Sequence, residues 1–183
     1  MKHHHSRKAH FDFRWPSPPL HVVLVAPEIP PNTGNVARLC AATGTRLHLV
    51  EPLGFSVDDA HLRRAGLDYW ESVQVAIHPS WTACAEALRP NRLFLFSTGS
   101  PRRYDHASFA PGDALVFGCE SKGLPSSLLA ERPDSVLGIP IRTDHVRSLN
   151  LSSSVAIAVY EALRQIDGAA PPPTSTPPCP APG

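Results

Sequence analysis

Six short and continuously apolar runs, separated by segments with helical spacing, constrain the fold of this chain most. Runs without polar alternation are typical of strands that are buried on both faces, as in parallel sheets covered by helices. The alternation therefore predicts an α/β fold: a single domain with a mostly parallel sheet flanked by helices. We expect strands at 21–26, 47–51, 73–78, 92–97, 114–119 and 135–140, and helices at 34–42, 59–65, 81–88, 126–130 and 150–166.

The two ends of the chain differ in composition from its middle. With 183 residues, one domain is expected. Residues 1–20 predict a disordered basic and histidine-rich tail, with an RNA-contacting arm as the alternative, and residues 168–183 predict a disordered proline-rich tail. The domain is expected over 21–167.

Charge and hydropathy narrow the class of protein. The chain carries a net charge of +1, of which the first 20 residues hold +3, so the domain itself is slightly acidic. Such a domain is a poor candidate for a general nucleic-acid coat protein. Its composition does not exclude a site-specific RNA enzyme with a local basic cluster. No apolar stretch is long enough for a membrane helix, and no secretory signal is evident, so no membrane is involved and a cytoplasmic location is expected.

Four cysteines, Cys40, Cys84, Cys119 and Cys179, lack the CxxC spacing of metal sites and redox motifs. We expect free thiols in a reducing compartment, and no metal.

Polar and glycine-rich residues gather in four loops that follow predicted strands: 27–33, 97–100, 118–123 and 140–149. In parallel sheets, ligands bind at the carboxyl ends of strands, which is where these loops lie. The first loop lacks the G-x-G-x-x-G pattern of dinucleotide sites, and 118–123 lacks the Walker spacing. The common nucleotide folds are therefore disfavoured.

Arg38 stands out because the helix around it is otherwise small and apolar. We expect that helix to begin near Gly34, capped by Asn32 or Thr33, and to end at Gly44. A cation close to a helix N-terminus gains nothing from the helix dipole. The position indicates an anion from a substrate or from another subunit, with a salt bridge to a core carboxylate as the alternative.

The start of the last helix is unusually rich in hydroxyl and amide groups. Capping explains one such residue, but here a whole cluster follows a charged loop. We interpret this segment as a pocket wall that presents backbone N–H groups to a ligand. The cluster is Ser148, Asn150, Ser152, Ser153 and Ser154, and the loop contributes Arg142, Asp144, His145 and Arg147.

Three segments in order resemble the motifs of the SPOUT class of RNA 2′-O-methyltransferases: PEIPPNTGNVARLC, LVFGCESKGLP and IPIRTDHVRSLNLSSSVAIAVYEALRQ. The segment LHLVEPLGFSVDDAHLRRAGLDYW is similar to that of the small bacterial tRNA (cytidine(34)-2′-O)-methyltransferases. The resemblance covers about 21–166. It implies a C-terminal trefoil knot, an exception to the rule that chains do not thread loops.

The resemblance implies S-adenosylmethionine as the methyl donor, with Phe96, Gly118, Ile139 and Ser148 as its contacts. Phe96 would pack on the adenine, Gly118 would permit close backbone approach, and Ile139 would close the apolar side. Without the resemblance, Phe96 and Ile139 would be ordinary core. Glu120 and Asn150 also match motif positions, as residues that fix the loops or simply cap them.

The resemblance also implies that Arg38 acts at the target ribose. The class consists of dimers in which the first-motif helix completes the partner's active site. Asn32 and Asn35 share this region and would hold the ribose or the arginine.

The substrate implied is the ribose 2′-hydroxyl of the wobble nucleotide of tRNA, cytidine or modified uridine 34. The basic residues Lys122, Arg142 and Arg147 are candidate RNA contacts. Two alternatives stay open: methylation of another RNA such as ribosomal RNA, and a catalytically silent RNA-binding dimer.

One departure from the class lies in the third motif. The residues Asp144-His145-Val146-Arg147 stand where Asp-Ser-Arg is typical, so a substrate-facing loop is one residue longer. An imidazole can titrate near neutrality, so His145 is a candidate proton relay, with a solvated loop histidine as the simpler interpretation.

Overall fold

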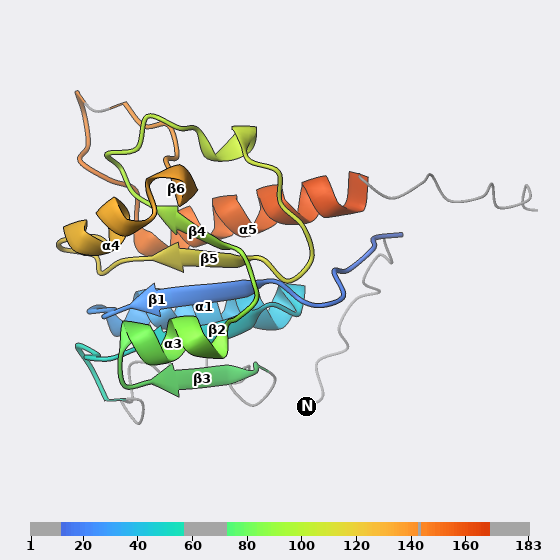
Figure 1. Ribbon diagram of the computed structural model, residues 1–183, viewed down its shortest axis with the longest axis horizontal. Helices are drawn as coiled ribbons and strands as arrows, with labels where there is room; N and C mark the ends of the chain where they lie inside the picture. The colour runs from blue at the N-terminus through green and yellow to red at the C-terminus, as the bar shows by residue number, and fades with distance from the viewer. Residues whose placement is uncertain (1–11, 57–72, 143, 169–183) are drawn as a thin grey trace, which may run out of the picture.

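A computed structural model describes residues 12–56, 73–142 and 144–168. Its centre is a six-stranded sheet in the order β3-β2-β1-β5-β4-β6, in which every neighbouring pair is parallel (Figure 1). The predicted parallel α/β fold is therefore confirmed. The strands are β1 His21–Val25, β2 Arg46–Val50, β3 Val75–His78, β4 Leu93–Phe96, β5 Ala114–Phe117 and β6 Val136–Leu137.

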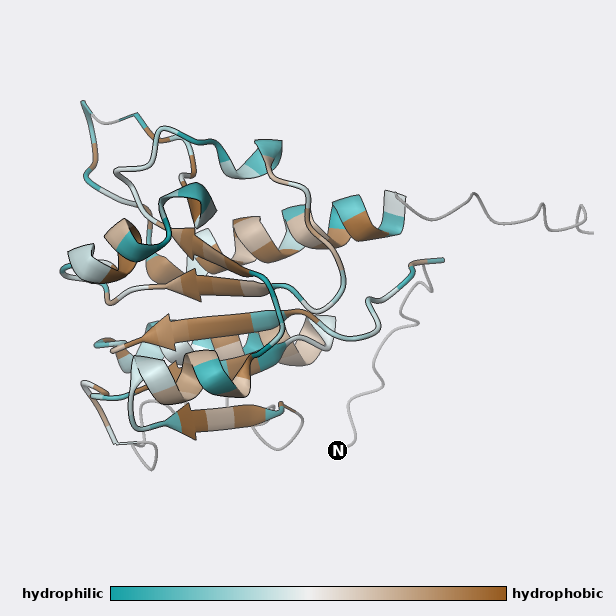
Figure 2. Ribbon diagram, viewed as in Figure 1, coloured by the Kyte–Doolittle hydropathy of each residue, from teal (hydrophilic) through white to brown (hydrophobic). Residues whose placement is uncertain are grey.

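Helices cover both faces of the sheet. The longer two, α1 Pro30–Thr43 and α5 Leu151–Gly168, share one apolar core with the sheet, and α3 Trp81–Ala87 and α4 Ser126–Glu131 share the other. The hydrophobic strands lie between these helix layers (Figure 2), as expected for strands that are buried on both faces. Two short 3₁₀ helices, η2 Tyr104–His106 and η3 Pro133–Ser135, complete the described elements, and the helix predicted at 59–65 lies outside the described residues.

Helix α1 begins earlier than its sequence suggests. Its N-cap is Ile29, which makes no side-chain capping bond, and Pro30 opens the first turn. The predicted start near Gly34 with an Asn32 or Thr33 cap is therefore wrong. Proline lacks an N–H that the first turn would leave unpaired anyway, and its φ suits a helix, so the prolines start the helix instead of delaying it. Gly44 ends the helix as expected, in the left-handed region at φ 66°.

The strand β6 is shorter than the predicted run of 135–140. Gly138 leaves the ladder and bridges to Arg103, donating its N–H to Arg102 O at 2.8 Å. A side chain at Gly138 would come within 2.8 Å of Ser100 O, so two backbone segments lie against each other here at close range. The trefoil knot itself stays a prediction.

The segment before β1 lies against the domain. Phe13 packs on the core shared by α1 and α5, Leu20 is fully buried, and Arg14 N donates to Asp167 Oδ1 at 3.0 Å. The predicted tail thus includes a stretch that contacts the domain, and the boundaries at 21 and 167 stay predictions. Among the helices of the described chain, none has the length and apolarity needed to span a bilayer.

Candidate functional site

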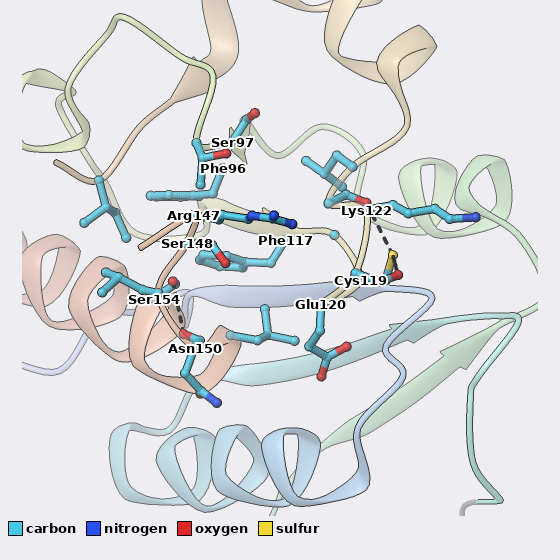
Figure 3. A pocket seen from close by; sticks show the side chains of 18 of the residues that line it. Phe96, Ser97, Phe117, Cys119, Glu120, Lys122, Arg147, Ser148, Asn150 and Ser154 are labelled. Carbon is cyan, nitrogen blue, oxygen red and sulfur yellow. Dashed lines mark hydrogen bonds between the residues drawn. The ribbon is translucent and has the colours of Figure 1, made fainter. Parts of the chain in front are cut away.

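A cavity of about 620 Å³ lies at the carboxyl edge of the sheet (Figure 3). Its walls come from the start of α1, from the loops after β4 and β5, and from the segment that joins β6 to α5. These are the segments in which the sequence placed polar and glycine-rich residues. The predicted residues that line it are Asn32, Phe96, Gly118, Glu120, Lys122, Ile139, Arg147, Ser148 and Asn150.

One wall of the cavity is aromatic. Phe96, the last residue of β4, stacks on Phe117, the last residue of β5, with ring centroids 4.6 Å apart and planes 14° from parallel. Both rings are almost fully buried, and Ile139 extends this surface. The motif resemblance predicts Phe96 at the site but not Phe117, because the pairing of β4 with β5 cannot be derived from either strand alone.

Gly118 is required by the protein's own backbone. A Cβ at this position would lie 1.9 Å from Gly123 C and 2.1 Å from Leu124 N. The loop closes on itself through the Gly123 N–H, which donates to Cys119 O at 2.9 Å. The expected close approach of backbone therefore occurs at Gly118, and the approaching partner in this structure is the same loop.

Two reciprocal carboxylates join the loop after β1 to the loop after β5. Glu120 accepts hydrogen bonds from Glu28 N at 2.8 Å, from Ile29 N at 3.3 Å and from Asn32 Nδ2 at 2.9 Å. In return, the Glu28 carboxylate accepts from Ser121 N at 3.0 Å and from Ser121 Oγ at 2.7 Å. Hydrogen bonds to a charged acceptor are stronger than neutral ones, so this pair fixes the mutual position of the two loops.

Asn150 connects the third segment to the same network. Its Nδ2 donates to Asn32 Oδ1 at 2.9 Å, while its Oδ1 accepts from Ser152 N at 2.9 Å at the start of α5. Asn150 thus caps the start of α5 and also links two loops. Both roles were expected of it from the sequence. Asn32 is 6% exposed and uses both ends of its amide within the network, so its position favours a structural role over contact with a ribose.

Arg38 and Asn35 lie outside this cavity. They line a separate, open hollow between α1 and α5, together with Leu39, Ala42, Ser152, Ser153 and Ala156. The arginine is exposed in this hollow, so within one chain it does not line the cavity expected to bind the cofactor.

The predicted basic contacts are divided in the same way. Lys122 and Arg147 line the cavity, and the Lys122 side chain extends away from its centre toward the rim (Figure 3). Arg142 is exposed and is not among the lining residues of either hollow. His145 is also exposed, with its Nε2 3.4 Å from Asp144 Oδ2.

Several residues of the site were not predicted from the sequence. Glu28 carried a usable signal, an acid in a loop stiffened by prolines, but its partner Ser121 is 93 residues away. Ser154, which also lines the cavity, donates its Oγ to Asn150 O at 3.2 Å. The Ser154 bond is local, whereas the Glu28–Ser121 contact depends on how distant loops meet at the edge of the sheet.

The chain is similar to a known family and to proteins named as RNA methyltransferases. The model of the SpoU rRNA Methylase family matches residues 19–160. A tRNA (cytidine(34)-2′-O)-methyltransferase of Burkholderia ambifaria is 57% identical over 148 residues, which cover 79% of this chain and 94% of the relative. The enzyme of that name from Escherichia coli is 50% identical over 148 residues, covering 80% of this chain and 94% of its own.

A solved structure described as giving structural insights into the 2-OH methylation of C/U34 on tRNA superimposes with a TM-score of 0.78. It is 50% identical in sequence and covers 81% of this chain and 97% of that one. The matched region includes the whole cavity, from the loop after β1 to the start of α5. This protein belongs to the SpoU rRNA Methylase family.

Proposed function

We propose that this protein transfers a methyl group from S-adenosylmethionine to the ribose 2′-hydroxyl of the wobble nucleotide, cytidine or modified uridine 34, of tRNA. One observation carries the choice of target: relatives named for cytidine 34 are matched at 50–57% identity over 94% of their length. The family supports methyl transfer in general.

The cavity fits the proposed methyl donor. Its size lies within the range of small-molecule sites. The stacked pair Phe96 and Phe117, with Ile139, offers an apolar surface for the base, and Ser148 and Ser154 offer hydroxyls at the polar side. Bound there, S-adenosylmethionine supplies a methyl group that is already activated on a sulfonium sulfur.

The residues of the chain therefore have to hold the methyl donor and align it with the ribose hydroxyl, because alignment of reacting groups supplies much of the rate of such a transfer. Glu120, Asn150 and Asn32 keep the loops of the cavity in register. We assign Arg38 to the ribose oxygen or the adjacent phosphate, where a guanidinium stabilises developing negative charge. A guanidinium is not deprotonated in proteins, so Arg38 serves as a positioning group and not as a base.

The positions of Arg38 and the cavity support the proposal of a homodimer. Arg38 lies in the hollow between α1 and α5 and not in the cavity of its own chain. The small residues Ala42, Ser152 and Ala156 around it allow close approach of a second copy. We propose that Arg38, with Asn35 beside it, reaches the cavity of the partner across a two-fold axis.

The RNA is proposed to contact Lys122 and Arg147 at the rim of the cavity, with Arg142 further along the same segment. The proposed place of action is the cytoplasm.

The test is incubation of the purified protein with labelled S-adenosylmethionine and either unmodified total tRNA or ribosomal RNA, followed by mapping of the labelled nucleotide. Label on the ribose of nucleotide 34 is expected. Label confined to ribosomal RNA would replace the target, and RNA binding without transfer to either would favour a silent RNA-binding dimer.

A further inference from the structure

Three histidines form a continuous chain beneath α3, on the face of the sheet opposite α1 and α5. His21 Nδ1 lies 2.9 Å from His48 Nε2, and His48 Nδ1 lies 2.9 Å from His78 Nε2. The three residues come from the neighbouring strands β1, β2 and β3. The methyl-transfer reaction uses none of them.

The register of the sheet explains how they meet. Strand residues alternate between faces, so His21 points to the same side as Val23, and His78 to the same side as its partner Val50. Val23 and Val50 belong to the apolar core that α3 covers. The imidazoles thus enter the edge of a hydrophobic layer, where His48 is only 8% exposed.

A thiol completes the cluster. Helix α3 starts just after β3, with the Ser80 side chain accepting from Ala83 N, and this start places Cys84 over the strands. Cys84 is fully buried, and one ligand atom each from His48, His78 and Cys84 lies within 4.8 Å of the others. We propose that His48, His78 and Cys84 bind a borderline divalent transition-metal ion, with Zn²⁺ as the first candidate.

The geometry suits such an ion after a small adjustment. Zinc bonds of about 2.0–2.1 Å to nitrogen and 2.3 Å to sulfur place tetrahedral ligand atoms roughly 3.3–3.6 Å apart. The observed separations, 2.9 Å between the two nitrogens and at most 4.8 Å overall, bracket these values. Two imidazoles with one thiolate are a ligand set that favours zinc over hard ions such as Mg²⁺ or Ca²⁺.

His21 fits the role of an outer partner. When a histidine binds a metal through one ring nitrogen, the other nitrogen usually donates its proton to a fixed acceptor. Here His48 Nδ1 faces His78 Nε2, while His48 Nε2 faces His21 Nδ1. With the His48 proton on Nε2 and donated to His21, His48 Nδ1 has its lone pair free for the ion.

Proton balance follows from the resting states of the ligands. The pKa of His48 falls to about 4, through burial first and then through His21, His78 and the Arg46 guanidinium, so its imidazole is already neutral. Burial raises the pKa of the Cys84 thiol to about 11, so binding releases one proton from sulfur to solvent. His78 moves its proton from Nε2 to Nδ1 without a net change. The half-buried His78 provides the route of entry.

The metal would fasten the edge of the sheet. β3 is the edge strand in the described order, and the ion would link it to β2 through His48 and to α3 through Cys84. The site is therefore expected to stabilise the folded chain without contributing to methyl transfer.

The test uses the full chain with the four histidines of its head, His3, His4, His5 and His10, replaced by alanine. Short histidine-rich tracts are themselves a common metal-binding composition and would obscure the result. After treatment with a chelator, the protein is titrated with Co²⁺ and with Zn²⁺. We expect one ion per chain, a thiolate-to-cobalt charge-transfer band, and a Tm raised by about 5–10 °C at a hundredfold excess of Zn²⁺ over Kd.

Cys84→Ala is expected to abolish the band and to weaken binding beyond the roughly 10–100-fold effect of an outer partner. His78→Gln serves as the second variant if Cys84→Ala does not fold. Cys40→Ala removes an equally buried thiol on α1 and is the matched control, which should retain the band. Absence of stoichiometric binding, or binding unchanged in the folded Cys84 and His78 variants, would overturn the proposal.

Discussion

Gly118 shows how a single residue sets the shape of the cavity. A methyl group there would lie 1.9 Å from Gly123 C, so Gly118→Ala must displace the loop that carries Glu120 and Lys122. Overpacking costs about 1–3 kcal/mol. We expect this strain to destabilise the loop in its ligand-bound conformation. The affinity for S-adenosylmethionine should then drop roughly 10- to 100-fold, measured by titration calorimetry.

The matched control is Gly99→Ala, whose added methyl group meets its nearest atom, Ser97 Oγ, at an ordinary 3.8 Å. It should bind the methyl donor like the parent protein. Equal affinity of the Gly118 variant would contradict the assignment of the loop to the binding site.

Arg38→Lys tests the forked donor geometry that we assign to the guanidinium. Lysine keeps the charge but cannot donate two parallel hydrogen bonds to a ribose oxygen and a phosphate. We expect kcat to fall about 10- to 100-fold at saturating tRNA and methyl donor, with unchanged affinity for the donor. Arg89→Lys, an exposed change just past the end of α3, is the control. Near-normal turnover of the Arg38 variant would contradict the role assigned to the guanidinium.

At the scale of elements, the cavity depends on loops held together by carboxylates. Glu120→Gln removes the charge that accepts from Glu28 N, Ile29 N and Asn32 Nδ2. A lost charge-assisted network costs about 1–3 kcal/mol, which urea unfolding would detect. Glu131→Gln, an exposed change on α4, should leave the unfolding free energy within about 0.5 kcal/mol of the parent. Equal stability of the two variants would show that the network does not hold the loops.

The histidine chain predicts an acid-sensitive sheet edge. Burial lowers the pKa of His48 from 6.5 to about 4, so only the unfolded chain takes up its proton between these values. The stability is present above pH 6.5 and is lost as the pH falls toward 4, by up to roughly 3 kcal/mol. Urea unfolding of chelator-treated protein from pH 7 to 4.5 should show this loss.

His48→Gln should reduce that pH dependence without abolishing it, because burial also lowers the pKa of His21 and of His78. The exposed His106→Gln should leave the slope unchanged. An unchanged slope in the His48 variant would place the acid sensitivity elsewhere.

How far the sequence predicts the structure also differs between elements. The apolar runs predicted the strands because the central parallel strands β1, β4 and β5 are buried along their whole length, and Gly44 predicted the end of α1. The start of α1 was mistaken because Pro30 was taken as a loop residue. The Phe96–Phe117 stack and the Glu28–Ser121 pair could not be predicted, since both depend on sheet order and on contacts between residues far apart in the chain.

For the whole molecule, the separation of Arg38 from the cavity predicts that active sites are shared between chains. Arg38→Ala should be nearly inactive alone, and so should Gly118→Ala when the methyl donor is kept well below the raised Kd of that variant. After the two are unfolded and refolded together in equal amounts, half of the dimers are mixed and each regains one intact site. Activity should recover to about a quarter of the parent value. No recovery, with mixed dimers demonstrated, would place Arg38 in its own chain's site.

The fold class was predictable at this scale, and the site residues were named mainly through a resemblance. The division of those residues between two hollows could not be predicted from the sequence. Arg38 and Asn32 lie six positions apart on one helix and face different surroundings. Their roles separate only once α5 is placed beside α1.

The central claim is methylation of one hydroxyl, and a substrate that lacks it gives the most direct measurement. A tRNA accepted by the protein is prepared with 2′-deoxyribose at nucleotide 34 alone, and methyl transfer from labelled S-adenosylmethionine is measured beside the unaltered tRNA. We predict full transfer to the unaltered tRNA and none to the deoxy substrate, with binding of the two RNAs similar. Equal transfer to both would contradict the account.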